Sequence, residues 1–183
     1  MSEPDGWRVL GERVAVDNAP WLRTRELRVD TGSGHAIDRY YVHDYPDWVN
    51  VVAVTGRGTV LVNRQWRQGA GRVIDELPSG TIDEGEDPRT TALRELREET
   101  GFAFASCEQV ARYSPNPANH TNVAYGFLAR GGRQAGEQEL EDSESIAVRE
   151  VSVDEFARMT RAGQWVNAMH QATAWAALAR LGV

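Results

Sequence analysis

Residues 80–102, GTIDEGEDPRTTALRELREETGF, form the stretch from which the fold of the chain is best predicted. Their second half carries the signals of a short, sharply bounded helix. Asp87 is a capping residue, Pro88 suits the first helical position, and Gly101 suits a left-handed stop. We therefore expect a helix that begins after Asp87 and ends before Gly101.

Three glutamates lie on one side of this predicted helix. At about 100° per residue, Glu95, Glu98 and Glu99 fall within an arc of about 100°, whereas Leu93 and Leu96 point away from it. Like charges three or four residues apart cost about 0.2–0.5 kcal/mol per pair. A hard divalent cation such as Mg²⁺, which binds oxygen ligands, would relieve that repulsion.

The alternative is a solvent-exposed charged face whose counter-charges are Arg94 and Arg97. The spacing of the whole stretch argues against it. Two glycines, four glutamates and an arginine at fixed offsets would arise by chance at a frequency on the order of 10⁻⁸ to 10⁻⁹ per start position. The pattern is therefore treated as a functional motif.

The motif resembles the signature of the Nudix hydrolases, which cleave nucleoside diphosphates linked to another moiety. Every fixed position of that signature is present, and weaker likeness extends over most of the chain. Phe102 departs from it, because the family usually has an aliphatic residue at the last position. Glu86 and Arg94 are expected to pair and so brace the loop on the helix.

The resemblance implies a metal-dependent active site along the helix. Glu95, Glu98 and Glu99 would be metal ligands, and the carbonyl of Gly80 would complete the site. The expected ion is Mg²⁺ or Mn²⁺. Glu98 and Glu99 are also the catalytic candidates that the signature itself contributes.

Two segments before the signature, 64–67 (RQWR) and 75–80 (DELPSG), resemble the ADP-ribose and nucleotide-sugar branch of the family. By that resemblance Arg67 and Glu76 would contact the substrate. Their alternative interpretation is a cross-strand ion pair. Pro117 matches a proline that ADP-ribose pyrophosphatases have at about this distance past the signature, which makes it a further substrate-binding candidate.

An acidic segment, residues 137–144, precedes the last predicted strand. In the ADP-ribose branch an acidic residue on this loop positions or deprotonates the attacking water. By that resemblance Asp142 and Glu144 are the best catalytic candidates, followed by Glu141, with Glu139 left open. A loop that merely faces solvent is the alternative, because most runs of charge do.

Two aromatic residues are candidates for substrate contact. Trp48, or an aromatic neighbour, could stack on the nucleotide base. The alternative for Trp48 is core packing, the usual place of large aromatic side chains. His120 lies in a loop rich in Pro and Asn and could touch the substrate, although an isolated loop histidine is more often only solvated.

The composition limits the class of protein. With 183 residues and 41% hydrophobic residues, the chain suits one globular domain. Its net charge of -7 argues against a general binder of nucleic acid or anionic membranes. Its single cysteine, Cys107, and the absence of a signal peptide or long apolar run predict a cytoplasmic location. The chain has no lysine, so phosphate recognition must use arginine, backbone amides or metal.

We expect an α+β fold: a Nudix-like α/β/α sandwich with a mixed sheet, preceded by a small antiparallel β arm. The predicted domain covers residues 1–183, with the arm over 1–46 as a dimerisation element. The expected strands of the sheet are 49–54, 59–66, 108–113, 123–129 and 146–151, and the expected C-terminal helices are 154–162 and 166–181.

The sequence predicts hydrolysis of the pyrophosphate bond of a nucleoside diphosphate derivative, with ADP-ribose or a nucleotide sugar as first choice. One alternative is a Nudix enzyme for another nucleotide, such as an oxidised nucleoside triphosphate, a dinucleoside polyphosphate or coenzyme A. Another is a non-catalytic domain that binds a nucleotide sugar or regulates a partner. The expected substrate is a small molecule, and the expected assembly is a homodimer.

Overall fold

The computed structural model describes residues 6–183, which divide into two compact units. The first unit holds the described residues up to Pro46 together with Ser114–Asn122. The second holds Asp47–Tyr113 and Val123–Val183. One domain with an arm over 1–46 stays a prediction, and the membership of Ser114–Asn122 in the first unit is a feature that the sequence did not indicate.

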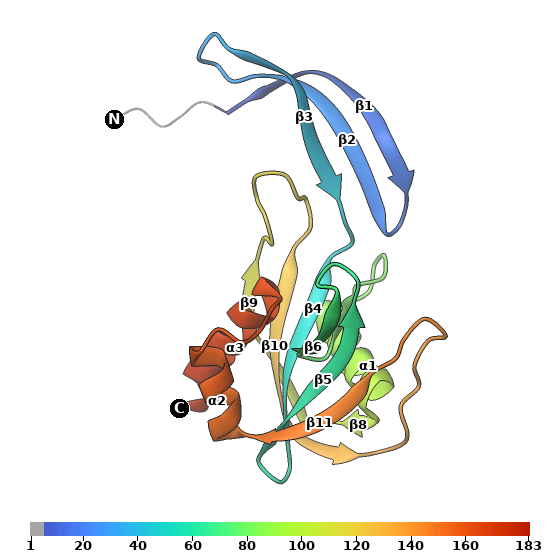
Figure 1. Cartoon of the computed structure of the whole chain (residues 1–183), viewed down its shortest axis with the longest axis vertical. Helices are drawn as coiled ribbons and strands as arrows, with labels where there is room; N and C mark the ends of the chain where they lie inside the picture. Colours follow the sequence, from blue (N-terminus) through green and yellow to red (C-terminus); the bar gives the residue numbers. More distant parts are fainter. Residues whose placement is uncertain (1–5) are drawn as a thin grey trace. The chain divides into compact units, whose positions relative to one another are not determined.

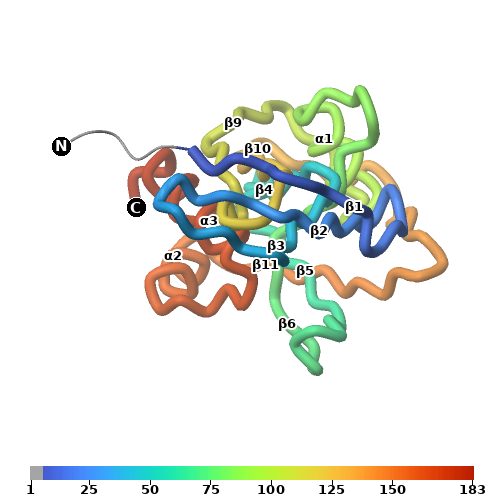
Figure 2. Tube along the Cα trace, turned by 90° about the horizontal axis from the view of Figure 1, so that it is seen from above, coloured from blue at the N-terminus to red at the C-terminus, as the bar shows by residue number. Residues whose placement is uncertain are grey.

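The first unit is an antiparallel sheet of three strands, β1 (Arg8–Asn18), β2 (Leu22–Asp30) and β3 (Ala36–Asp44). The expected antiparallel arm is therefore confirmed. The pairing of β1 with β2 shifts register twice. Figures 1 and 2 both show the three strands side by side.

Neither face of strand β1 is covered by the residues that the structure describes. All of its residues are exposed, and its large apolar side chains are between 44% and 52% accessible: Val9, Leu10, Val14 and Val16. Exposed apolar side chains on an edge strand are unusual in a protein that has no partner. The arm therefore offers a surface that a second chain could cover.

The second unit is built on a mixed sheet in the order β11-β5-β4-β10-β8. Strands β4 and β10 run parallel, and the remaining pairs are antiparallel. Further strands extend the sheet, β6 on β5, β7 on β4 and β9 on β10. The strands are β4 (Trp48–Thr55), β5 (Thr59–Arg67), β6 (Arg72–Glu76), β7 (Ser79–Thr81), β8 (Phe102–Ala103), β9 (Ser106–Tyr113), β10 (Ala124–Gln134) and β11 (Ala147–Ser152).

Helices cover both faces of this sheet. Helix α1 (Pro88–Thr100) lies on one face, and α2 (Val153–Arg161) and α3 (Ala168–Leu181) lie on the other (Figures 1 and 2). Alternate residues of β4 serve the two layers, since Val51 belongs to the cluster with Leu96 of α1 and Val52 to the cluster with the C-terminal helices. The α/β/α sandwich and the mixed sheet are confirmed.

Helix α1 begins and ends where its sequence predicts. The Asp87 carboxylate accepts hydrogen bonds from the N–H groups of Arg89 and Thr90, each at 3.1 Å. Gly101 takes φ of 72° and donates its N–H to the Arg97 carbonyl. Local capping chemistry alone therefore fixes the ends of the helix that carries the signature.

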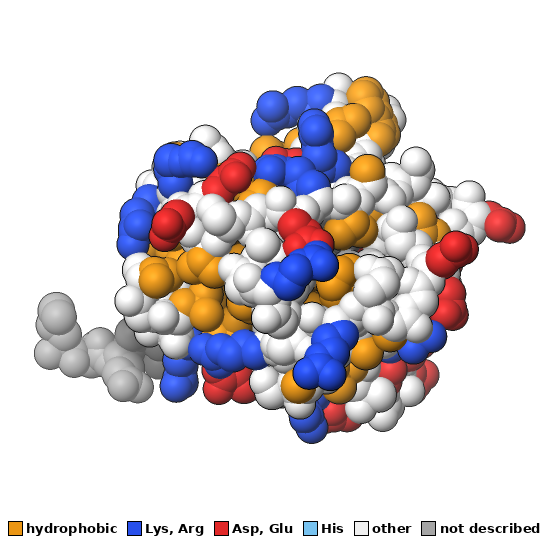
Figure 3. Space-filling model, turned by 90° about the horizontal axis from the view of Figure 1, so that it is seen from below, with side chains coloured by type: hydrophobic (Ala, Val, Ile, Leu, Met, Phe, Trp, Pro, Cys, Tyr) orange, Lys and Arg blue, Asp and Glu red, His pale blue; other side chains and the backbone are white. Residues whose placement is uncertain are grey.

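The other predicted elements of the sheet are confirmed within a few residues, except that β10 continues further, to Gln134. The expected strands did not include β6, the three-residue β7 or the two-residue β8. On the face shown in Figure 3, arginine and acidic side chains are interspersed with small hydrophobic patches, so this face has no broad surface of one charge. None of the described helices is both long and apolar enough to cross a membrane.

Candidate active site

Two of the three signature glutamates on α1 are buried. Glu95 is 9% exposed and Glu99 is 2% exposed, whereas the Glu98 side chain is 35% exposed. A solvated charged face is therefore excluded for Glu95 and Glu99. The carboxylates also share the inner side of the helix with Leu96, although the helical arc had separated them from the apolar side chains.

Gly80 approaches Glu95 so closely that only glycine fits. A Cβ atom placed on Gly80 would lie 2.0 Å from Glu95 Oε1. Gly80 is in β7, which pairs with β4, so the sheet holds its backbone against the helix. The structure thus brings together two of the four groups predicted to hold metal.

The Glu99 carboxylate is fixed by two donors. Its Oε2 accepts a hydrogen bond from the Ser79 N–H at 2.8 Å and another from Asn63 Nδ2 at 3.0 Å. Ser79 directly precedes Gly80, so Glu99 and Glu95 are tied to adjacent residues of β7. Asn63 and Ser79 were not among the predicted site residues.

Arg94 supplies positive charge among these carboxylates. Its guanidinium donates to Glu98 at 2.8 Å, to Glu95 at 3.0 Å and to Glu86 at 3.2 Å. The predicted pairing of Arg94 with Glu86 is confirmed. Burial works against the charge of Arg94, but these three carboxylates outweigh it and raise its pKa above the ordinary value.

Burial disfavours the ionised form of both buried carboxylates, Glu95 and Glu99. Loss of water raises the pKa of Glu95 to about 7, against the opposing charge of Arg94. Burial also raises the pKa of Glu99 well above its ordinary range, although the Ser79 N–H opposes the shift. The negative charge of Glu144 contributes to both shifts, which places Glu144 within electrostatic reach of the site.

The acidic loop is attached to the C-terminal end of α1. The Glu139 N–H donates to the Glu98 carbonyl at 2.8 Å. Gln138 Nε2 donates to the carbonyls of Glu99 and Ile146 at 2.6 and 3.1 Å, so one side chain links the helix to both ends of the loop. Gln138 is a third residue that the sequence did not single out.

Among the acidic candidates of this loop, Glu144 is the one whose charge acts on Glu95 and Glu99. Its side chain also accepts from the Glu141 N–H at 3.0 Å, and Glu144 is half-buried. Asp142 and Glu141 are exposed, and neither is among the main causes of the raised pKa of Glu95 or Glu99. Glu144 is therefore the stronger of the two catalytic candidates predicted here.

Arg67 and Glu76 form the ion pair that was the alternative to substrate contact. Arg67 Nε donates to Glu76 Oε2 at 2.7 Å, and Gln65 Nε2 donates to the same oxygen at 3.0 Å. Glu76 is directly opposite Asn63 in the pairing of β5 with β6. The pair therefore borders the same polar region as Glu99, and its contact with substrate stays a prediction.

The structure does not bring Trp48 to the carboxylates. Trp48 shares a face of β4 with Val52, which packs against the C-terminal helices, and its Nε1 is buried without a partner among the described residues. Pro117 and His120 belong to the first unit, where the His120 ring lies edge-on to His43 and Tyr45. His120 is therefore packed in an aromatic cluster rather than freely solvated.

The donor chemistry of the α1 site suits a hard divalent cation. Carboxylate oxygens and a backbone carbonyl are the ligands that Mg²⁺ and Mn²⁺ accept, and two buried carboxylates here lack sufficient positive charge. Within residues 6–183, no three His, Cys, Asp or Glu side chains already stand in position to hold one ion. The Arg94 guanidinium supplies the positive charge between Glu95 and Glu98. It would have to give up its hydrogen bonds to these two carboxylates when a cation binds.

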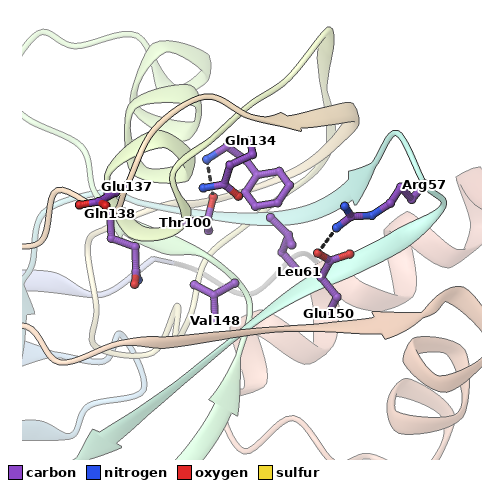
Figure 4. Close-up of a pocket in the computed structure, with 9 residues that line it drawn as sticks. Arg57, Leu61, Thr100, Gln134, Glu137, Gln138, Val148 and Glu150 are labelled. Atoms are coloured by element: carbon purple, nitrogen blue, oxygen red, sulfur yellow. Dashed lines mark hydrogen bonds and ion pairs between the residues drawn. The ribbon is translucent and has the colours of Figure 1, made fainter.

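A separate cavity of about 720 Å³ lies at the C-terminal end of α1. Leu61 and Val148 line it from the sheet, and Gln138 lines it from the base of the acidic loop (Figure 4). Arg57 and Glu150 pair at the other end. None of the predicted site residues is among the described residues that line this cavity.

The fold and the carboxylate site together define a hydrolase of the Nudix class, and comparison with known proteins agrees. The NUDIX domain family model matches residues 44–176, so the chain belongs to the NUDIX family. The predicted recognition and enzyme class are confirmed.

Individual relatives give a more specific comparison. An ADP-ribose pyrophosphatase of Bacillus subtilis is 33% identical over 132 residues, covering 72% of this chain and 71% of its own. An ADP-ribose pyrophosphatase of Mycobacterium tuberculosis is 32% identical over 171 residues, covering 92% and 81%. A solved ADP compounds hydrolase superposes with a TM-score of 0.86 at 16% identity, covering 100% of this chain and 97% of that chain, and so shows the shared fold.

Proposed function

We propose that the protein is a divalent-metal-dependent pyrophosphatase that acts on a nucleoside diphosphate linked to another moiety, with ADP-ribose or a nucleotide sugar as the substrate. The observation that carries this proposal is the pair of buried carboxylates, Glu95 and Glu99, beside Gly80 and within reach of Glu144. Similarity to two ADP-ribose pyrophosphatases supports this choice of substrate.

In this proposal Glu95, Glu98, Glu99 and the Gly80 carbonyl hold Mg²⁺ or Mn²⁺. When bound, the cation stabilises the negative charge that develops as a phosphorus–oxygen bond of the pyrophosphate breaks. Burial of Glu95 and Glu99 supports this role, because a carboxylate that is costly to ionise alone gains most from a nearby cation.

Glu144 takes the proton of the attacking water, and Asp142 is the second candidate for this step. Water oxygen bonds to one phosphorus, the bridging oxygen leaves with the other, and the products are a nucleoside monophosphate and a phosphorylated remainder. A base must lie within hydrogen-bond reach of the water or one water away. The hold of Gln138 on the loop supports a fixed position for Glu144.

Arg67 and Glu76 bind the substrate in this proposal, and Trp48 and Pro117 remain weaker candidates. Arg67 is already oriented by Glu76, which itself is 2% exposed, so its guanidinium is held at the edge of the polar region. A guanidinium suits a phosphate, especially in a chain that has no lysine.

We further propose a cytoplasmic homodimer that uses the exposed apolar side chains of β1 as its interface. Val9, Val14 and Val16 on an uncovered strand support such an interface. The one cysteine, Cys107, is buried and free, which suits a reducing compartment. Light scattering behind size-exclusion chromatography would give the mass, and a monomer at micromolar concentration would contradict the dimer.

The substrate is tested by a panel assay with product identification. Purified protein with Mg²⁺ is incubated with ADP-ribose, nucleotide sugars, oxidised nucleoside triphosphates, dinucleoside polyphosphates and coenzyme A. We expect AMP and ribose 5-phosphate from ADP-ribose, and the corresponding monophosphate from a nucleotide sugar. If none of the panel is cleaved but one compound binds, the protein is a binding domain and the proposal fails. Cleavage of only another class would reassign the substrate.

A further inference from the structure

Asn63 is a buried polar residue in an otherwise apolar part of β5. Val60, Leu61 and Val62 precede it, and all four residues are 0% exposed. Asparagine is unfavourable in strands, and burying its amide costs free energy unless the amide is hydrogen-bonded. Its Oδ1 has no partner among the described residues, so packing alone gives no reason for an asparagine here.

The amide nitrogen of Asn63 makes one specific contact. Nδ2 donates to Glu99 Oε2 at 3.0 Å, across 36 residues of sequence and from the sheet to α1. The same oxygen accepts from the Ser79 N–H at 2.8 Å. A carboxylate oxygen has two lone pairs in the plane of the group, so two donors occupy Oε2 fully.

The other carboxylate oxygen of Glu99, Oε1, differs from Oε2 in its hydrogen bonding. No hydrogen bond to Glu99 Oε1 is formed by the part of the chain that the structure describes, although Glu99 as a whole is only 2% exposed. The two donors therefore orient the carboxylate and distinguish its oxygens. One oxygen is bound to the protein, and the other is left for a further ligand.

We propose that Asn63 is a positioning residue for Glu99, which together with the Ser79 N–H holds Oε2 and leaves Oε1 as the oxygen offered to a divalent cation. This inference rests on the proposed function, because it assumes that Glu99 is a metal ligand. Residues that hydrogen-bond to metal ligands orient them, and their loss weakens metal affinity or activity by about 10- to 100-fold.

Asn50 provides a matched control within the same sheet. It is also 0% exposed, and its Oδ1 also lacks a partner among the described residues. Its Nδ2, however, donates to the Tyr113 hydroxyl at 3.4 Å, on the face of β4 that packs against the C-terminal helices. Asn50 and Asn63 therefore share residue type and burial but differ in their contact with Glu99.

The test measures Mn²⁺ binding to metal-free protein, with free Mn²⁺ followed by electron paramagnetic resonance. Leucine replaces each asparagine with a side chain of the same branching and no donor, and the added volume is the same at both positions. We expect Asn63→Leu to weaken Mn²⁺ binding about tenfold and Asn50→Leu to change it less than about twofold. Thermal unfolding of the metal-free proteins shows whether both variants are folded. On the cleaved substrate, Asn63→Leu should lower kcat with little change in KM.

Two results would overturn the role of Asn63: wild-type affinity in Asn63→Leu, or an equal loss in Asn50→Leu. If Asn63→Leu does not fold, Asn63→Ala and Asn50→Ala are compared in the same way. Glu99→Gln separates this inference from the proposed function. Wild-type protein that binds no Mn²⁺, or Glu99→Gln that binds it normally, contradicts the metal site itself rather than the hold that Asn63 has on it.

Discussion

The two faces of the central sheet are both covered by helices, yet different side chains are buried on them. Against α2 and α3 the cluster is apolar, with Phe156, Trp165 and Leu178 at its centre. Against α1 an apolar cluster is joined by the buried carboxylates Glu95 and Glu99. Apolar burial stabilises a fold, whereas burial of ionisable groups opposes folding. The opposite face also buries an ionisable group, His170, but its imidazole accepts the Leu77 N–H. The α1 face buries two carboxylates of the signature, whose burial is explained by chemistry rather than by stability.

Replacement of Glu99 by Gln should give the largest effect and should separate activity from stability. Glutamine keeps the shape and one carbonyl oxygen for the Ser79 N–H but removes the charge. We expect kcat to fall about 10³-fold, since several kcal/mol of charge stabilisation are lost. The melting temperature in EDTA should stay equal or rise, because a costly buried carboxyl is removed. Activity within tenfold of wild type would contradict the role of the α1 face.

Replacement of Leu178 by Ala tests the opposite face. Leu178 is 2% exposed in the cluster with Phe156, so its truncation leaves a cavity. We expect a loss of about 2–5 kcal/mol in the free energy of unfolding in urea. The kcat of the folded protein should change less than about twofold. The control is Trp175→Ala on the same helix, where a side chain in a residue that is 49% exposed should matter much less.

Replacement of Gly80 by Ala tests the close approach of β7 to the helix. The new methyl group would lie 2.0 Å from Glu95 Oε1 and would displace that carboxylate. We expect kcat to fall about 10²-fold, the usual consequence of a misplacement of about 1 Å in an active site. Gly69→Ala is the control, because nothing lies within 4 Å of its added Cβ. Equal activities of the two variants would show that Glu95 needs no exact placement.

Measured for each pH unit, the smallest effect concerns pH and the face of the sheet that α3 covers. His170 is fully buried, accepts the Leu77 N–H at 3.0 Å, and has its pKa lowered to about 3 by burial and by the charge of Arg67. As the pH falls below 6.5, His170 becomes protonated in the unfolded chain but stays neutral in the folded protein. The stability that His170 contributes is thus full above that pH and is lost as pH falls toward 3, by up to about 1.4 kcal/mol per pH unit.

His170→Asn should flatten this slope, because asparagine can accept the same hydrogen bond but does not titrate. Urea unfolding between pH 4 and pH 7 measures the slope. The exposed His35, replaced in the same way, is the control and should leave the slope as it is. A wild-type slope in His170→Asn would show that other groups cause the loss of stability in acid.

What the sequence could predict depended on how far apart the interacting residues are. The ends of α1 follow from Asp87 and Gly101, because capping is a contact between near neighbours. The signature spacing also singled out Glu95 and Glu99, which the structure buries against adjacent residues of β7. Their burial was not foreseen, because helical periodicity shows which residues share a side and does not show what covers that side.

The unforeseen parts of the site depend on contacts between distant residues. Asn63 and Glu99 are 36 positions apart, and nothing in the run VLVN indicates which helix the asparagine will meet. The polar residue that ends this buried apolar run was the one signal available. Gln138 was missed for the same reason, because it lies within a run of charged residues and nothing there indicates that its side chain contacts α1.

The first unit is discontinuous, and this has a consequence for any shortened version of the protein. Its first segment ends at Pro46, but Ser114–Asn122 returns to it from between two strands of the second unit, where the Asn119 carbonyl accepts the His43 N–H at 2.8 Å. In a shortened protein that starts after Pro46, the nine residues Ser114–Asn122 would lack the sheet that they contact. The first unit is therefore built from two separate segments of the chain. It cannot be deleted, or transferred to another protein, by moving its N-terminal segment alone.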